Sequence, residues 1–116
     1  VLYGFAESNE DSLQYNYSDQ FRGEINVDSA GNVYISSSTR SVNFPFKNGF
    51  DSTLNGMQDA VAFKLNNDLS QLIWSTYLGG GDNDAGYALS FDDSLNVYVT
   101  GGLKRSNINT TTTALK

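Results

Sequence analysis

Short apolar stretches, several of them alternating with polar residues, recur along the chain and predict β-strands. Ile25 and Val27 alternate with Glu24 and Asn26, which is the period-two pattern of a half-buried strand. No window shows sustained helical periodicity, and β-branched residues, Asn and Gly are frequent, so no helix is expected. The predicted strands are Val1–Phe5, Gly23–Val27, Val33–Ser36, Asp59–Leu65, Leu72–Leu78, Tyr87–Phe91 and Val97–Gly101.

The last two predicted strands restate the pair near the start of the chain. Asn32-Val33-Tyr34 returns 64 residues later as Asn96-Val97-Tyr98, and Asp28 then falls on Asp92. The polar loop Ala6–Gln20 before the first copy is longer than the loop before the second copy. A fixed strand pattern with loops of variable length is typical of a repeat architecture.

Both strand pairs carry a tight-turn signal. Asp28 to Asn32 predicts a hairpin in which the Asp carboxylate accepts backbone N–H groups and Gly31 has a positive φ. Asp92 begins the second turn, but Leu95 stands where the first turn has Gly31. Because Leu carries a Cβ, the second turn must either differ or hold Leu95 under strain of about 1 kcal/mol or more. Both Asp residues are therefore interpreted as structural.

The predicted strand Leu72–Leu78 contains the single Trp of the chain. Trp74 is predicted to be buried in the outermost strand of a four-stranded unit. Alternation places Leu72 and Leu78 on the face of Trp74, and Ile73 and Tyr77 on the opposite face. The aromatic residues around Pro45, in the long connection before the predicted strand Asp59–Leu65, are expected to plug the edge of the sheet.

Composition narrows the possible functions. The formal net charge is −6 in 116 residues, which argues against a nucleic-acid partner and against charge-driven binding to anionic membranes. The absence of Cys excludes disulfides and thiolate metal sites, and the absence of His excludes Ser-His-Asp catalysis and His-based zinc sites. No apolar run is long enough to span a membrane, and no signal peptide is visible.

Several motifs, in the right order, resemble the bacterial β-propeller repeat often called the SBBP repeat. The motifs are Asn43-Phe44-Pro45, Asp59–Asn66, Trp74–Gly80, Asp84–Ala88, Asp92 and Asn96–Gly101. Asn107-Ile108-Asn109 departs from the family pattern, because it stands in place of the second Phe-Pro connection. The resemblance implies blades of four antiparallel strands in large, secreted or surface-exposed proteins, which often carry a C-terminal sorting domain for type IX secretion in Bacteroidetes-like bacteria. The family has no common catalytic residue set to carry over.

The chain is interpreted as a fragment of an all-β propeller. Residues 1–22 are expected to hold the outer strand of a preceding blade and a loop. Residues 23–78 are expected to form one complete blade, and residues 79–116 the inner half of the next blade. A propeller needs about four to eight blades, so the remaining blades would come from the parent chain or from other copies.

Two groups of acidic residues have a conceivable chemical role. The Gly79–Asp84 loop offers oxygen atoms of the kind that calcium prefers, and it equally fits a turn with solvated carboxylates. The pairs Asp82/Asp84 and Asp92/Asp93 could serve as acid and base in glycoside hydrolysis, or could be ordinary turn residues. No residue is assigned as catalytic, cofactor-binding or metal-binding.

Aromatic and hydroxyl side chains leave further alternatives open. The aromatic residues Trp74, Tyr77, Tyr87 and Tyr98 could stack on sugars, although their strand positions favour packing between blades. The pairs Asp11-Ser12, Asp28-Ser29, Asp51-Ser52 and Asp93-Ser94 resemble the O-glycosylation signal of Bacteroidetes and also fit turns. Asn16 and Asn109 fit the N-glycosylation acceptor.

The sequence favours a non-catalytic scaffold, an interaction or adhesion module of a large secreted or cell-surface bacterial protein. A narrower version is cargo or a partner of a type IX secretion or gliding machinery. The alternative is part of a propeller enzyme that acts on glycans with carboxylates in its central channel. Expected partners are the remaining blades of the parent chain and surface proteins, secretion-machinery proteins or glycans, without nucleic acid and without a cofactor.

Overall fold

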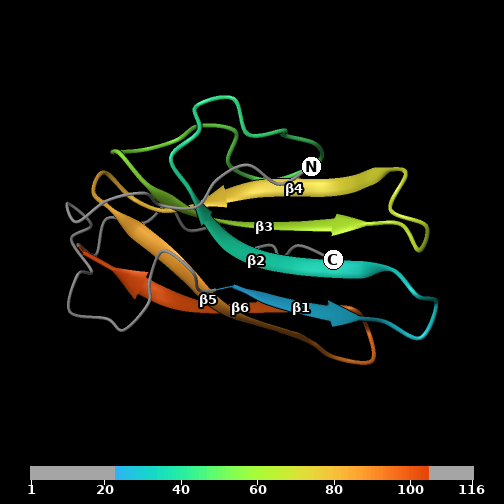
Figure 1. Cartoon of the computed structure of the whole chain (residues 1–116). Helices are drawn as coiled ribbons and strands as arrows, with labels where there is room; N and C mark the ends of the chain where they lie inside the picture. The colour runs from blue at the N-terminus through green and yellow to red at the C-terminus, as the bar shows by residue number, and fades with distance from the viewer. Residues whose placement is uncertain (1–22, 105–116) are drawn as a thin grey trace.

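The computed structural model describes residues 23–104 and has six β-strands in this range (Figure 1). One sheet has four antiparallel strands in the order β1-β2-β3-β4, and β5 and β6 form a separate antiparallel pair. The strands are β1 (Glu24–Val27), β2 (Val33–Thr39), β3 (Asp59–Leu65), β4 (Leu72–Leu78), β5 (Asp84–Phe91) and β6 (Val97–Leu103). Residues 23–104 contain no helix, and hence none long and apolar enough to cross a membrane. The predicted all-β class is confirmed.

The predicted strand boundaries within this range need four changes, the first being that β1 begins at Glu24 rather than at Gly23. β2 continues to Thr39 and β6 to Leu103, and β5 begins at Asp84 rather than at Tyr87. Asp84 was expected in a flexible, solvated loop, but it is buried and starts the strand. Other predicted features lie outside the described residues, namely Val1–Phe5, Ala6–Gln20, Asp11-Ser12, Asn107-Ile108-Asn109 and the acceptors Asn16 and Asn109.

Both faces of the four-stranded sheet are apolar, and the β5–β6 pair covers one of them (Figure 1). The core on the covered face consists of Tyr34, Ala62, Trp74 and Leu89. The core on the opposite face consists of Ile35, Val61, Phe63 and Tyr77. Strand alternation sends neighbouring residues of β2 and β3 to opposite faces, so each strand contributes to both cores.

Trp74 lies in the outermost strand of the four-stranded sheet and is only 4% exposed, as predicted. The predicted facing of its neighbours is wrong in one respect. The β3–β4 register shifts at Lys64/Leu65, where Leu65 pairs with Leu72 and Lys64 with Trp74. The extra residue, Ile73, therefore packs with the Trp74 core, and Leu72 packs on the opposite face.

The connection between β2 and β3 covers the outer edge of β4. The N–H of Ser75 donates to the carbonyl of Lys47 at 2.8 Å, and the N–H of Tyr77 donates to the carbonyl of Asp51 at 3.0 Å. The Ser75 hydroxyl also donates to the carbonyl of Pro45. The predicted edge plug is thus made by main-chain groups, while Phe44 packs on Phe63 and Tyr77 of the adjacent core.

Candidate functional site

Asp28 is the centre of a polar cluster at the β1–β2 turn. Its Oδ1 accepts the N–H groups of Ala30 and Asn32 at 3.0 and 2.9 Å. Its Oδ2 accepts the Asn32 amide and the Tyr34 hydroxyl, both at 3.1 Å. Lys64 on β3 completes the cluster, because its Nζ lies 3.8 Å from Asp28 Oδ2 and 4.6 Å from the Tyr34 ring centroid.

Asp92 repeats this arrangement at the β5–β6 turn. Its Oδ1 accepts the N–H groups of Ser94 and Asn96, both at 2.9 Å. Its Oδ2 accepts the Asn96 amide at 2.9 Å and the Tyr98 hydroxyl at 3.1 Å. The predicted role of both Asp residues as turn-forming acceptors is therefore confirmed.

The second turn keeps the geometry of the first although it lacks the glycine. The Gly31 N–H donates to the carbonyl of Asp28, and the Leu95 N–H donates in the same way to Asp92, each at 2.9 Å. Gly31 has φ of 85° and Leu95 has φ of 62°. Of the two expected outcomes, the strained conformation of Leu95 is the one that occurs.

The hydrogen bonds favour the ionised form of both carboxyl groups. Burial acts to raise the pKa of Asp28, but the bonds from Asn32, Tyr34 and Ala30 outweigh it, and the pKa lies below its usual value. Bonds from the Asn96 side chain and backbone lower the pKa of Asp92. The hydrogen bond to Asp92 raises the pKa of Tyr98. Both clusters therefore present a carboxylate that a cation can neutralise.

A second group of acidic residues lies at the opposite ends of the strands, where β3 and β5 begin. Asp59 and Asp84 are both fully buried and both lie against the backbone of Gly79. Asp84 accepts the N–H groups of Gly80 and Lys104, and Asp59 Oδ2 accepts the N–H of Asn55. Within the described part of the chain, the other oxygen of Asp59 has no hydrogen-bond partner.

Asp59 differs from the turn carboxylates in its charge state. Burial raises the pKa of Asp59 to about 7, with a further contribution from the carboxylates of Asp84 and Asp51. When it is protonated, the Asp59 carboxyl can donate a hydrogen bond within this group. When it is ionised, it is repelled by the two neighbouring carboxylates. Asp59 therefore binds a proton at a higher pH than an ordinary Asp carboxyl does.

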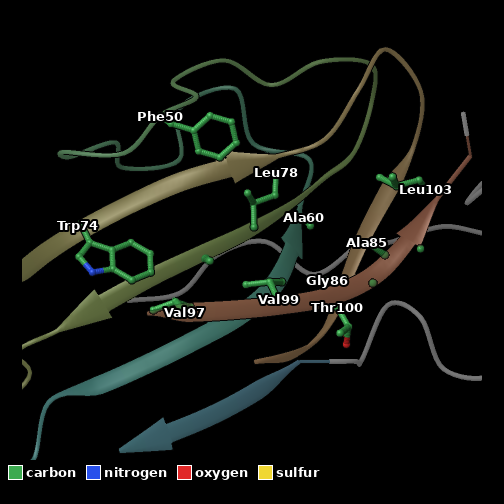
Figure 2. Close-up of a pocket in the computed structure, with 13 residues that line it drawn as sticks. Phe50, Ala60, Trp74, Leu78, Ala85, Gly86, Val97, Val99, Thr100 and Leu103 are labelled. Atoms are coloured by element: carbon green, nitrogen blue, oxygen red, sulfur yellow. The ribbon is translucent and has the colours of Figure 1, made fainter. Parts of the chain in front are cut away.

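An apolar groove of about 450 Å³ runs between the two sheets (Figure 2). Trp74, Leu78 and Phe50 line the side formed by β4 and its covering connection, and Val97 and Val99 line the side formed by β6. Most of the residues that line this groove are apolar, and the buried indole N–H of Trp74 has no hydrogen-bond partner among residues 23–104. The groove suits apolar side chains rather than a charged substrate.

The structure gives the two members of each acidic pair considered from the sequence different surroundings. Asp82 lies 3.8 Å from the Lys104 ammonium, while Asp84 is buried in hydrogen bonds to the backbone. Asp92 is held in its turn, and Asp93 is exposed. Among residues 23–104, no three His, Cys, Asp or Glu side chains gather in a group that could hold a metal ion.

The aromatic residues considered for sugar stacking also differ in their burial. Trp74 and Tyr77 are buried in the cores on the two faces, and Tyr87 is half-buried. Tyr98 is 58% exposed. Sequence reasoning missed Asp59 and Lys64 as members of the two polar clusters. Both lie in one predicted strand, and their partners became visible only once that strand was placed beside its neighbours.

A four-stranded antiparallel sheet with a second antiparallel sheet packed on its face is consistent with neighbouring propeller blades. Residues 73–101, which run from β4 through β5 into β6, match the SBBP family, described as a beta-propeller repeat. The predicted resemblance to the SBBP repeat is thus confirmed over residues 73–101. No curated protein and no solved structure matches the chain.

Proposed function

We propose that this chain is part of a non-catalytic β-propeller scaffold that offers its loops and faces for protein interaction. The observation that carries the proposal is the packing of the two sheets, in which Tyr34 of β2 lies 4.6 Å from Phe91 of β5 between ring centroids. In this proposal residues 23–78 are one complete blade and residues 79–116 the inner half of the next. Residues 1–22 hold the outer strand of the preceding blade.

The packing fits blades that follow one another in a ring. The side chains of Glu24 and Asn26 on β1 bond the N–H and the carbonyl of Leu89 on β5, at 2.7 and 2.5 Å. The two sheets are thus joined both by side chain-to-backbone hydrogen bonds and by an apolar core, which suits a scaffold of packed blades.

The proposed parent protein is secreted or exposed at the bacterial cell surface. There it would bind surface proteins, components of a type IX secretion or gliding machinery, or glycans. This part of the proposal is supported by the resemblance to SBBP proteins and by the acidic composition, which suits a soluble extracellular surface.

The alternative of a glycan-cleaving enzyme receives less support. The carboxylates of Asp28, Asp84 and Asp92 each hold backbone N–H groups, so they serve the fold. Glu24, which β1 presents toward β5, is engaged with the Leu89 N–H. A general acid or base needs a carboxyl group that can reach a substrate.

The experiment is to measure the mass and the location of the native protein that carries this sequence. An antibody against the chain would be used on culture medium, on material released from intact cells by protease, and on cytosol. We expect a protein on the order of 250–500 residues or more, enough for four to eight blades, outside the cytosol. A native, folded, monomeric protein of 116 residues would contradict the scaffold, and a purely cytosolic protein would contradict the location.

A further inference from the structure

A pair of buried carboxyl groups joins the two sheets beside Gly79. Asp59 is the first residue of β3 in the four-stranded sheet, and Asp84 is the first residue of β5 in the second sheet. Their exposed fractions are 0% and 1%. A Cβ placed on Gly79 would clash with Asp59 Oδ1 and would lie 2.8 Å from Asp84 Oδ2. The two carboxyl groups therefore close on the same point, which only a glycine leaves open.

The hydrogen bonds around this pair leave one of its oxygens without a donor. Asp84 Oδ2 accepts the Gly80 N–H at 2.6 Å, and Asp84 Oδ1 accepts the Lys104 N–H at 3.2 Å. Asp59 Oδ2 accepts the Asn55 N–H at 2.9 Å. Asp59 Oδ1, on the side that faces Gly79, has no partner in the described part of the chain. Buried polar atoms without a partner are rare and require an explanation.

No cation neutralises the pair. The titratable side chains on the elements around it are Asp51 before β3, Tyr77 on β4, Asp82 in the β4–β5 loop, Lys104 after β6 and Arg40 after β2. The Lys104 ammonium lies 3.8 Å from Asp82, and the Arg40 guanidinium donates to the side-chain carbonyl of Gln58 at 3.5 Å. Among residues 23–104, neither carboxyl group of the pair forms an ion pair.

A single proton would satisfy this arrangement, because two carboxyl groups that share a buried site do not both ionise readily. We propose that Asp59 Oδ1 donates a proton to Asp84 Oδ2, and that loss of this proton loosens the junction of the two sheets at the β4–β5 loop. Asp84 Oδ2 can accept this bond beside the one from Gly80, since a carboxylate oxygen has two lone pairs. Without the proton, two carboxylates repel each other across Gly79.

The junction is thus a pH-sensitive contact that is closed in mild acid and looser above neutral pH. The direction agrees with the pKa of Asp59, which burial raises to about 7, because the closed form binds the proton more tightly than an open form with an ordinary Asp would. The pair acts in this way whether or not the parent protein is a scaffold.

The first test follows the two carboxyl groups directly, by NMR of the full 116-residue chain labelled with ¹³C at aspartate. A shared proton is a property of the pair, so the carboxyl carbons of Asp59 and Asp84 should move with one common midpoint. We expect this midpoint near pH 7. The Asp84→Asn variant removes the ionised neighbour and should move the Asp59 midpoint to lower pH.

The second test measures the opening of the junction by amide hydrogen exchange, as the ratio of the intrinsic to the observed rate at each pH. Protection of the Gly80 N–H should fall about tenfold between about pH 5.5 and pH 7.5, because the closed form loses its proton in this range. The Asn96 N–H is the internal control. It also bonds a carboxylate, that of Asp92, whose pKa is lowered, so its protection should stay constant.

Two variants connect the loss of protection to Asp59. Asp59→Asn keeps an oxygen for the Asn55 N–H and carries an amide that can donate to Asp84 at every pH, so Gly80 should stay protected throughout. Asp93→Asn is the matched control, because it removes the same charge from an exposed turn, and it should leave the decline unchanged.

Four results would overturn the inference. These are separate midpoints for the two carboxyl carbons, constant protection of Gly80 in the unmodified chain, an equal decline in the Asp59→Asn variant, or an equal decline at Asn96. The last result would show that the whole chain opens rather than the junction.

Discussion

The hairpins that begin at Asp28 and Asp92 differ in what surrounds them rather than in their own hydrogen bonds. Each Asp accepts two backbone N–H groups, one Asn amide and one Tyr hydroxyl. Tyr34 is then enclosed by Trp74, Phe91 and Lys64, while Tyr98 is left exposed. The turn is therefore a local product of its own residues, and the core around it depends on the third and fourth strands.

The two turns also differ in the residue that adopts the left-handed conformation. Gly31 has a left-handed φ without steric cost, whereas Leu95 adopts nearly the same φ with a Cβ. The Asp92 hydrogen bonds must offset that strain, since the turn has the same bond pattern. Side-chain capping thus determines this turn more strongly than the presence of glycine does.

Replacing Trp74 should leave Tyr34 less enclosed, so that its surroundings become more like those of Tyr98. Trp74→Ala would leave a large cavity beside Tyr34 and should lower the free energy of unfolding by about 3–5 kcal/mol. Urea unfolding followed by far-UV circular dichroism would measure it, because the variant has no Trp fluorescence. Trp74→Phe serves as a control with a smaller expected loss, and a loss below about 1 kcal/mol for the Ala variant would contradict the packing described here.

Replacing each turn carboxylate should show how much the contact with Lys64 on β3 adds to the stability of the first turn. Asp28→Ala leaves Lys64 and the Tyr34 hydroxyl without a partner in a buried site, so we expect a loss of about 3 kcal/mol. Asp92→Ala removes the turn bonds alone, and we expect about 1 kcal/mol. Urea unfolding followed by Trp74 fluorescence would compare the two. Equal losses would show that Lys64 adds nothing to the first cluster.

Changing the pH should separate the turn carboxylates from Asp59. The folded-state pKa of Asp59 is about 7, above its ordinary value of 3.8, so the folded chain binds the extra proton between these values. Its contribution to stability is present below pH 3.8 and is lost as the pH rises to 7, by at most about 1.4 kcal/mol per pH unit. The lowered pKa values of Asp28 and Asp92 act in the opposite sense, and their contribution is lost as the pH falls below 3.8.

Urea unfolding between pH 4 and pH 8 would detect the Asp59 contribution. The Asp59→Asn variant should remove the decline between pH 4 and pH 7 and leave the loss in acid intact. If the variant declines as steeply as the unmodified chain, another group is responsible.

Exchanging the residues at the left-handed positions should give effects of opposite sign. Leu95→Gly relieves the Cβ strain and should raise the free energy of unfolding by about 1 kcal/mol. Gly31→Leu introduces the same strain, and its Cβ would also lie 3.2 Å from the Cβ of Asn67, so this variant should be less stable than the unmodified chain. A shift in urea midpoint of the same sign for both variants would refute the strain at Leu95.

The parts of the fold that could be predicted from sequence are those set by local chemistry. Alternation located the strands, and the Asp turns followed from side chains that bond their own backbone. The bulge at Ile73 was missed because it depends on how β4 pairs with β3. Asp59 and Lys64 were missed as cluster members because their partners are remote in sequence, at Asp84 and Asp28.

The covered edge of β4 has a consequence for how such proteins can evolve. Lys47 and Asp51 take up the strand's N–H groups through their carbonyls, and the side chains of Lys47 and Asn48 bond the carbonyls of Leu72 and Ile73. An edge with these donors and acceptors engaged is a poorer template for a foreign strand, so repeats can be duplicated with less risk of forming fibres. We expect mutational drift toward new partners to spare residues 45–51 and to collect at the exposed turn after β3.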